Sequence, residues 1–453
     1  MNMSRALARF PARRGRLVCA SLGALCWVGC GDTDPLRDYF VDRSPREQYV
    51  AGLEAAGLDG SALAHDWVSA GSHALNRPTS VPTPYREAGY LDPAETRAEA
   101  FRFALRRGQR VLADVDVNGD SARLAMFVDL FVESDAADQP VLLATADSGT
   151  HRLEHVARRD GIYLLRIQPE LLRGGRYTLT IEAGASLAFP VSGVDARAIR
   201  SGFGAPRDGG RREHHGVDIF AARGTPVVAA SEAVVRRVAT RGLGGKVVWL
   251  RDARLGYSLY YAHLDSQLVR AGMRVAPGDT IGLVGNTGNA HSTPPHLHFG
   301  IYGRGVGPVD PWPFVFVPDV RAPAVRTDLE LIGEWRRVRG NRIQLRAAPG
   351  RDADILLELA PLTPVRVVAA SDTWVRVHLP DGQGGYLAAS LTEHIAPVGT
   401  ARLERGGWIR RDPIGGITVD SMAAGDEVPL LGRYGELALV TAPNGRSGWV
   451  VLE

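Results

Sequence analysis

The sequence predicts a mainly β protein built from several domains. Its 453 residues exceed the length of an ordinary single domain. Hydrophobic residues make up 45% and charged residues 23% of the chain, which is typical of a globular protein. From about residue 83 onward, short runs of alternating apolar residues are separated by glycine and other turn residues. We therefore expect an N-terminal β-sandwich, an antiparallel β-domain and two small barrels, in that order.

The first 29 residues have the pattern of an export signal. Five arginines accompany an apolar run of 13 residues, Leu17–Gly29, which is too short to span a bilayer comfortably. The end of this segment, Trp27-Val28-Gly29-Cys30, resembles the lipobox of bacterial lipoproteins, although leucine is usual where Trp27 stands. That resemblance implies a lipid on Cys30 and an exported chain, anchored to a membrane and facing the periplasm. The alternative is an ordinary cleaved signal followed by a chance cysteine.

Cysteine usage and charge agree with a processed, exported chain. All three cysteines (Cys19, Cys26 and Cys30) lie in this segment, so the processed chain keeps only Cys30 and forms no internal disulfide. The formal charge is +3, and residues 1–29 contribute five arginines and no acidic residue, so the processed chain carries −2. This balance gives no reason to expect nucleic-acid binding.

Two regions precede the central domain. Apolar residues recur near helical spacing in residues 46–56 and 63–75, so we expect residues 30–82 to form a tether with short helices. Residues 83–192 contain short runs of strand character, such as Val111–Val117, which favour an antiparallel sandwich. The stretch Gly161–Ile167 is similar to part of the pre-peptidase β-sandwich domains.

Two histidines one residue apart mark the central domain. In a strand, side chains alternate between faces, so His296 and His298 point to one side while Leu297 and Phe299 point to the other, into a core. Two imidazoles on one sheet face suit a metal site or acid–base chemistry. A pair of surface histidines on a half-exposed strand is the alternative.

The chain concentrates its histidines around this pair. Six of the 12 histidines lie between positions 214 and 298, namely His214, His215, His263, His291, His296 and His298. Asp218 follows the first two within four residues, and His263 closes another strand-like run. This clustering favours a functional site over scattered surface histidines.

The order of these motifs resembles a known family. An H-x-x-x-D motif, a Y-x-H-L run, a G-x-T-G turn and H-L-H-F follow one another as in the lysostaphin/LytM-type zinc metallopeptidases, which cut peptidoglycan peptides. The similarity covers roughly residues 195–315. It implies Zn²⁺ bound by His214, Asp218 and His298, with His263 and His296 as catalytic residues. His215 is the alternative to His214 as the first zinc ligand, and the spacing of the family motif favours His214.

The implied chemistry is consistent with these residue types. A catalytic zinc keeps three protein ligands and leaves the fourth position to water or substrate. The metal lowers the pKa of its bound water towards about 7 and polarises a carbonyl group. Either His263 or His296 takes the water proton, and the other stabilises the oxyanion or protonates the leaving amine. The sequence leaves open which histidine has which role.

The C-terminal part contains a repeat. We expect the peptidase-like domain over residues 195–318, a linker over 319–339, and domains over 340–394 and 396–453. Three short motifs resemble those of bacterial SH3-like domains, namely Leu345-Arg346, Trp374 and Gly385-Tyr386. A similar Gly448-Trp449 pair indicates a second, degraded copy of the domain. Such modules often bind cell-wall peptides, which suits an enzyme with a polymeric substrate. Purely structural packing is the alternative.

Taken together, these patterns predict a zinc endopeptidase that hydrolyses peptidoglycan cross-links, with peptidoglycan and a membrane as its partners. Resemblance to lipoprotein relatives of double-membraned bacteria favours the D-Ala–diaminopimelate bond over glycine bridges. One alternative is a non-hydrolytic LytM-like activator or scaffold, but such degenerate relatives have lost zinc ligands, and all five matching positions are intact here. Another is a wall-binding lipoprotein whose peptidase is occluded. The sequence identifies no regulatory protein.

Overall fold

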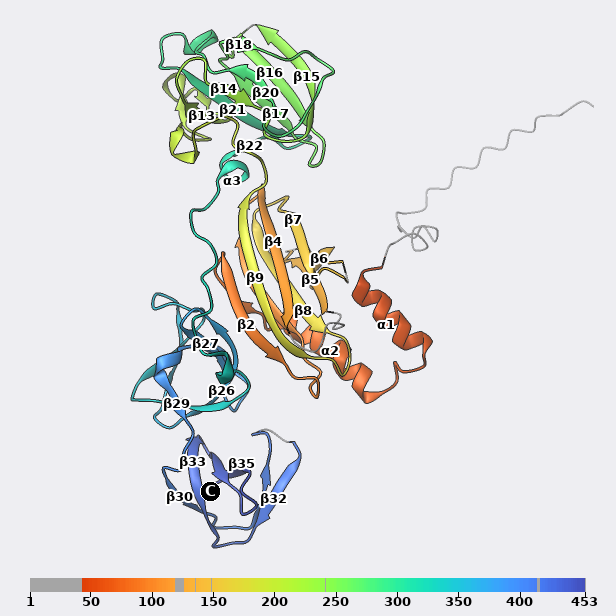
Figure 1. Ribbon diagram of the computed structural model, residues 1–453, viewed down its shortest axis with the longest axis vertical. Coiled ribbons are helices and arrows are strands. Elements are labelled where there is room, and N and C mark those ends of the chain that lie inside the picture. Colours follow the sequence, from red (N-terminus) through yellow and green to blue (C-terminus); the bar gives the residue numbers. More distant parts are fainter. Residues whose placement is uncertain are drawn as a thin grey trace, which may run out of the picture. The chain divides into compact units, whose positions relative to one another are not determined.

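The computed structural model describes residues 43–118, 126–134, 136–147, 149–240, 242–413 and 416–452. The chain divides into a unit up to Arg43 and a unit from Ser44 to Glu453, and only the second is described below. The prediction of a mainly β fold is confirmed (Figure 1). The expected signal and the expected lipid site at Cys30 lie outside the described residues. Within the described ranges, no helix has both the length and the apolar character needed to cross a bilayer.

Two helices precede the strands. Helix α1 (Pro45–Ala55) begins with a capping box, in which the Ser44 side chain accepts from the Glu47 backbone and the Glu47 side chain accepts from the Ser44 backbone. Helix α2 (Ala62–Asn76) buries Trp67, whose indole N–H donates to the carbonyl of Pro169 at 2.8 Å. This helix therefore packs on the sandwich instead of standing free.

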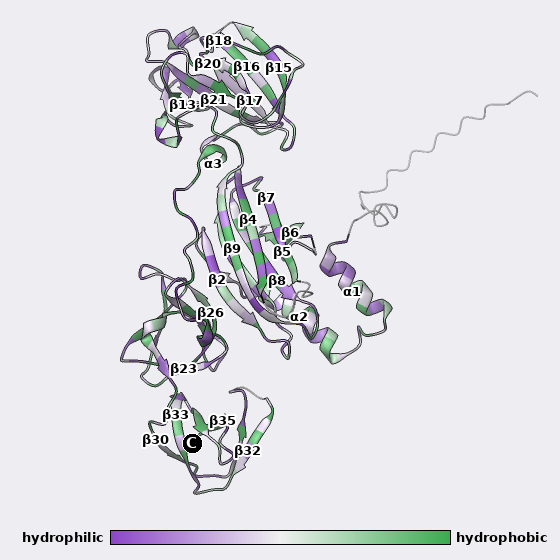
Figure 2. Ribbon diagram, viewed as in Figure 1, coloured by the Kyte–Doolittle hydropathy of each residue, from purple (hydrophilic) through white to green (hydrophobic). Residues whose placement is uncertain are grey.

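The sandwich consists of two sheets around one hydrophobic core. One sheet has the order β1-β3-β8-β5-β6, and the other contains β2-β9-β4-β7. Apolar residues are frequent along these strands (Figure 2), and side chains of both sheets meet in a shared hydrophobic core. The strand bounds are β1 (Thr79–Ser80), β2 (Tyr85–Leu91), β3 (Glu99–Leu105), β4 (Gln109–Asn118), β5 (Met126–Val132), β6 (Val141–Thr145), β7 (Arg152–Val156), β8 (Gly161–Pro169) and β9 (Gly175–Ala185).

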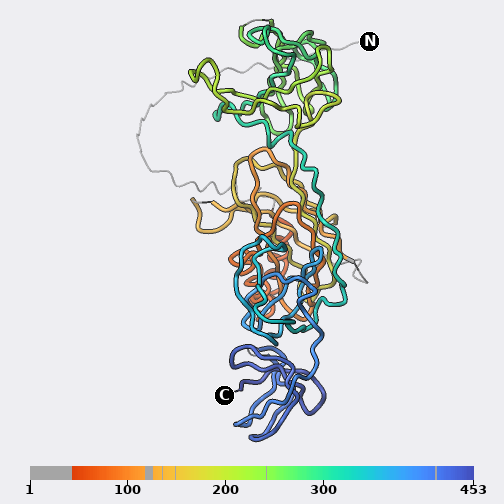
Figure 3. The backbone as a smooth tube through the Cα atoms, turned by 90° about the vertical axis from the view of Figure 1, so that its left-hand side faces the viewer, coloured from red at the N-terminus to blue at the C-terminus, as the bar shows by residue number. Residues whose placement is uncertain are grey.

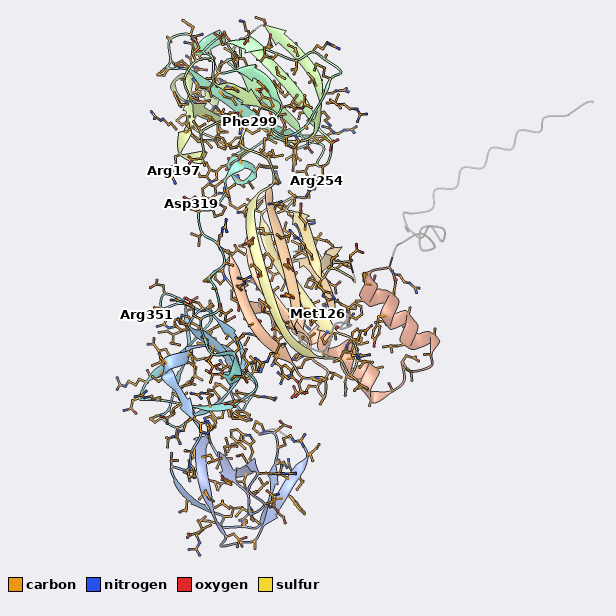
Figure 4. All side chains as sticks on the ribbon, viewed as in Figure 1. Met126, Arg197, Arg254, Phe299, Asp319 and Arg351 are labelled. Carbon is orange, nitrogen blue, oxygen red and sulfur yellow. The ribbon has the colours of Figure 1, made fainter. Side chains whose placement is uncertain are left out.

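The central domain is built on a sheet of order β10-β13-β21-β17-β16-β15-β19, with β22 paired to β21 and a second sheet of order β14-β20-β18. Leu297 and Phe299 of β21 are fully buried in its core, and Figure 4 labels Phe299. The strand bounds are β10 (Ile199–Ser201), β11 (Pro206–Arg207), β12 (Arg212–Glu213), β13 (Val217–Phe220), β14 (Pro226–Val228), β15 (Ala233–Thr240), β16 (Lys246–Asp252), β17 (Ser258–Ala262), β18 (Ser266–Gln267), β19 (Arg274–Val275), β20 (Thr280–Leu283), β21 (His296–Gly303) and β22 (Gly307–Val309).

A short helix, α3 (Trp312–Val315), closes the central domain. Its Phe314 belongs to the core of that domain and also packs against Gly108 of the sandwich. A Cβ atom at Gly108 would lie 2.2 Å from the Phe314 ring, and the φ of Gly108 is +92°, so this contact requires glycine. After α3 the chain continues as an extended segment towards the C-terminal domains (Figure 3).

The C-terminal part contains two further β-domains. Strand β23 lies in the stretch expected to be a linker and pairs with β26 and β29. Strand β26 also pairs with β2, so the sheet of the sandwich continues into the first of these domains. The second domain is a sheet of order β30-β33-β34-β35-β31-β32. The bounds are β23 (Trp335–Val338), β24 (Ile343–Arg346), β25 (Ile355–Leu359), β26 (Pro364–Ser371), β27 (Trp374–His378), β28 (Gly384–Ala388), β29 (Thr392–His394), β30 (Gly399–Arg402), β31 (Gly407–Arg410), β32 (Thr418–Met422), β33 (Glu427–Tyr434), β34 (Leu437–Thr441) and β35 (Ser447–Val451).

Candidate metal centre

The pairing of β13 with β21 creates the site. Asp218 is the register partner of His298, so the two side chains project from the same face of the sheet. The neighbouring Leu297 and Phe299 point into the core, as the alternation in the sequence predicts. His214 lies just before β13, and the start of that strand brings it beside the same face.

Three donor atoms converge on this face. His214 Nε2 lies 2.9 Å from His298 Nδ1, and Asp218 Oδ1 lies 3.0 Å from each of these nitrogens. All three residues are largely buried, and together they could hold a metal ion. Two ligands of a tetrahedral zinc at bond lengths near 2.05 Å are about 3.3 Å apart, so this donor set needs little adjustment to accept the ion.

The orientation of His214 is fixed by the backbone. Its Nδ1 lies 2.8 Å from the carbonyl oxygen of Gly202. A proton on Nδ1 therefore leaves the lone pair of Nε2 directed at the point where the three donor atoms converge. The neighbouring His215 is exposed and does not belong to the triad. Gly216 allows a close approach here, because a Cβ atom would lie 2.8 Å from the His298 ring.

His263 and His296 border the triad. Their ring centroids are 5.1 Å apart, and the His263 ring lies 5.9 Å from that of His298. The Nδ1 atom of His263 lies 2.8 Å from the carbonyl oxygen of Thr287, and that of His296 lies 2.9 Å from the carbonyl oxygen of Pro294. If these Nδ1 atoms carry the protons, both Nε2 atoms are free to accept one.

His263 has two unusual features. Its φ is +63°, a left-handed conformation that costs a residue with a side chain of this size about 1–3 kcal/mol and is concentrated at functional sites. Burial lowers the pKa of His263 to about 4, so its imidazole is neutral near pH 7. A neutral imidazole held in this position is able to accept a proton.

The charge of Asp218 is stabilised from two sides. Burial alone would raise the pKa of Asp218, but its close contacts with the His214 and His298 rings hold this pKa well below its usual range. On the other side, an Arg207 Nη2–H group donates to Asp218 Oδ2 at 2.6 Å. The carboxylate is thus ionised before any metal binds.

The sequence motifs gave no indication of Arg207. Two arginines on the same loop have other partners: Arg211 is exposed, Arg212 is partly exposed, and the guanidinium groups of both donate to Asp208. Arg207 lies 11 residues before Asp218, and no spacing in the sequence distinguishes it from its neighbours. Only the fold of this loop identifies the arginine that reaches the site.

An aromatic surface adjoins the triad. Trp249, Tyr260 and Tyr302 pack together, with ring centroids 4.3 Å apart for Trp249 and Tyr260. The Tyr260 ring meets that of His298 edge-on, with centroids 5.7 Å apart and an interplanar angle of 70°. Burial raises the pKa of Tyr260 to about 12, so its hydroxyl group stays protonated beside the site.

Comparison with known proteins places these residues in a family. Residues 212–311 match peptidase family M23, and all five histidine and aspartate residues of the site lie in that range. Residues 339–393 match the bacterial SH3 domain family.

Curated relatives share the central domain. An uncharacterized metalloprotease of Haemophilus influenzae is 46% identical over 23% of this chain and 22% of its own length. An L-Ala–D-Glu endopeptidase of Bacillus subtilis is 39% identical over 28% of this chain and 42% of its own length. A peptidoglycan DD-endopeptidase of Vibrio cholerae is 37% identical over 26% of this chain and 28% of its own length. The chain thus spans less than half the length of each of these relatives. With both family matches in place, the sequence carries a peptidase family M23 domain followed by a bacterial SH3 domain.

Proposed function

We propose that this protein is a zinc-dependent endopeptidase that hydrolyses peptide cross-links of bacterial peptidoglycan. The observation that carries the proposal is the convergence of His214, Asp218 and His298, whose donor atoms lie 2.9–3.0 Å apart, beside two further buried histidines. This arrangement has a place for a metal and separate groups for proton transfer.

The donor set supports zinc. Two imidazole nitrogens and one carboxylate oxygen suit Zn²⁺, whereas Mg²⁺ and Ca²⁺ prefer oxygen ligands alone. Three protein ligands also leave a position open, as catalytic zinc sites require. When bound, zinc supplies the Lewis acid that polarises the scissile carbonyl and activates water.

The protein's own groups supply the proton transfers. We assign one of His263 and His296 as the catalytic base that takes the water proton, and the other as the group that stabilises the oxyanion or protonates the leaving amine. Both rings border the triad, and backbone carbonyls hold both of them through Nδ1. Fixed in this way, each ring presents Nε2 without further reorganisation. The low pKa of His263 keeps that ring neutral and ready to accept a proton.

The proposed bond is the D-Ala–diaminopimelate cross-link. A relative named as a DD-endopeptidase supports this choice, while a relative named as an L-Ala–D-Glu endopeptidase makes that bond the main competitor. The bacterial SH3 domain supports a wall polymer as the substrate, since a second binding module raises the local concentration of polymer. Export and a lipid on Cys30 belong to the same proposal.

The test uses the purified chain from residue 30 to 453 and a His298→Ala variant. We expect about one zinc per chain and, on incubation with cross-linked muropeptides, products whose masses identify the cleaved bond. The variant should lose both zinc and cleavage. A chain that binds zinc but cleaves nothing would favour the scaffold or occluded alternative, and a chain without zinc would refute the metal assignment.

A further inference from the structure

We propose that Arg207 is a positioning residue that reserves one oxygen of Asp218, so that this carboxylate offers only its other oxygen to the metal. The inference rests on the metal site of the proposed function and adds a residue to it. Arg207 lies outside the range that matches peptidase family M23.

The two oxygens of Asp218 have different partners. Oδ1 lies 3.0 Å from His214 Nε2 and 3.0 Å from His298 Nδ1, which places it at the converging donor atoms. Oδ2 accepts from Arg207 Nη2 at 2.6 Å. The carboxylate is therefore divided between a metal side and a guanidinium side.

This division matters for the open coordination position. A carboxylate with two free oxygens is able to bind a metal through both, which occupies a position that water or substrate needs. The Asp218 side chain is only 11% exposed and that of Arg207 30%, so the charge-assisted hydrogen bond between them is shielded from bulk water. The bond thus holds Oδ2 away from the metal side.

Arg207 is itself held in place by elements of the site. Strands β11 and β12 form a hairpin in which Arg207 pairs with Arg212, and this hairpin leads directly to His214. The backbone N–H of His214 donates to the carbonyl oxygen of Ala205 at 2.9 Å. This bond connects His214 to the base of the same hairpin. One small element thus carries both the arginine and a donor of the triad.

A serine completes the arrangement. Ser201 of β10 is the register partner of Asp218, and its hydroxyl oxygen accepts from Arg207 Nη2 at 2.7 Å. The same hydroxyl lies 3.5 Å from His214 Nδ1. Ser201 and the carboxylate therefore accept from the same guanidinium nitrogen, and a change at Ser201 should weaken the positioning without removing charge.

The experiment compares the metal-binding behaviour of the full processed chain with that of Arg207→Ala. Protein stripped of metal is loaded with Co²⁺, whose visible absorption is stronger with four ligands than with five or six. We expect Arg207→Ala to lose visible absorption and to bind Co²⁺ and Zn²⁺ about 10-fold more weakly, as for other residues that orient metal ligands. Ser201→Ala should shift both quantities in the same direction by less.

Controls separate positioning from charge and from folding. Arg211→Ala removes an arginine from the same hairpin whose guanidinium group donates to the Asp208 carbonyl, so it should leave the spectrum and the affinity unchanged. If Arg207→Ala bound metal more tightly, the arginine would act only by repelling a cation, and the positioning role would be overturned. Should that variant not fold, as judged by circular dichroism, Ser201→Ala decides the question.

Two further outcomes distinguish this inference from the proposed function. If the unmodified chain binds Co²⁺ and His298→Ala does not, an unchanged spectrum and affinity in Arg207→Ala would overturn the role of Arg207 alone. If the unmodified chain takes up no Co²⁺ or Zn²⁺, the metal site and the role of Arg207 fall together.

Discussion

Removal of the Arg376 guanidinium group should destabilise the unit formed by the sandwich and the first C-terminal domain. Arg376 contacts Glu87 at 3.1 Å and Glu99 at 2.8 Å, and the Arg376 and Glu87 side chains are 3% and 0% exposed. Burial alone would lower the pKa of Arg376, but the charges of Glu87 and Glu99 raise it well above its ordinary value. Arg376 thus stays protonated, and Arg376→Met leaves a buried carboxylate without its partner, at a cost of about 3–5 kcal/mol.

The surroundings of Glu87 set the size of this effect. Tyr85 and Tyr177 donate to its two oxygens at 2.6 and 2.7 Å, so the carboxylate keeps two hydrogen bonds when the arginine is lost. These bonds place the expected cost at the lower end of that range, near 3 kcal/mol. The double variant Glu87→Gln with Arg376→Met removes both charges and should be less destabilised than Arg376→Met alone.

The assay is urea unfolding of the processed chain, followed by tryptophan fluorescence and by circular dichroism, since several domains need not unfold in one step. Arg102→Met is the matched control, because Arg102 pairs with Glu133 at 2.9 Å with both side chains well exposed, and its loss should cost less than about 1 kcal/mol. Equal costs for Arg102→Met and Arg376→Met would refute the reasoning from burial.

Other variants test the site, the pH response and the domain contact. His263→Ala and His296→Ala should each lower kcat for muropeptide cleavage about 10²–10⁴-fold while zinc content stays near one per chain; loss of zinc in either would show a ligand instead. Burial lowers the pKa of His378 to about 4, below the unfolded value near 6.5. The stability that the neutral ring contributes is therefore present above pH 6.5 and is lost as the pH falls through 4. His378→Gln should make the free energy of unfolding depend less on pH over that window, and an unchanged pH profile would contradict this. Gly108→Ala should lower the melting temperature, because the added Cβ overlaps the ring of Phe314. Gly149→Ala should not, because open space surrounds that position. Equal melting temperatures for the two variants would show that the contact between Gly108 and Phe314 rearranges without loss of stability.

Local patterns were sufficient for the strands that carry the site. The alternation across His296, Leu297, His298 and Phe299 indicated one polar and one buried face, and the two buried residues have no exposed surface in the structure. The mainly β fold and the two family matches agree with the same patterns and motifs. Such features depend on residues close together in the chain, so a single sequence is enough to indicate them.

Long-range pairing decided the rest. The register that places Asp218 opposite His298 joins strands 80 residues apart, and the contact of Arg207 with Asp218 depends on how one hairpin folds back. Nothing in the sequence showed that β2 would pair with β26 or that Glu87 would meet Arg376, because each contact joins distant segments; Glu87 and Arg376 are 289 residues apart.

The sequence by itself thus determined the type of fold, the alternation of each strand and the motif that carries the candidate ligands, since these follow from side-chain period and local spacing. Only the tertiary structure decided which arginine reaches the carboxylate, which oxygen stays on the metal side and which charges are buried together. Those features depend on contacts between distant segments, whose geometry is set by the packing of whole sheets.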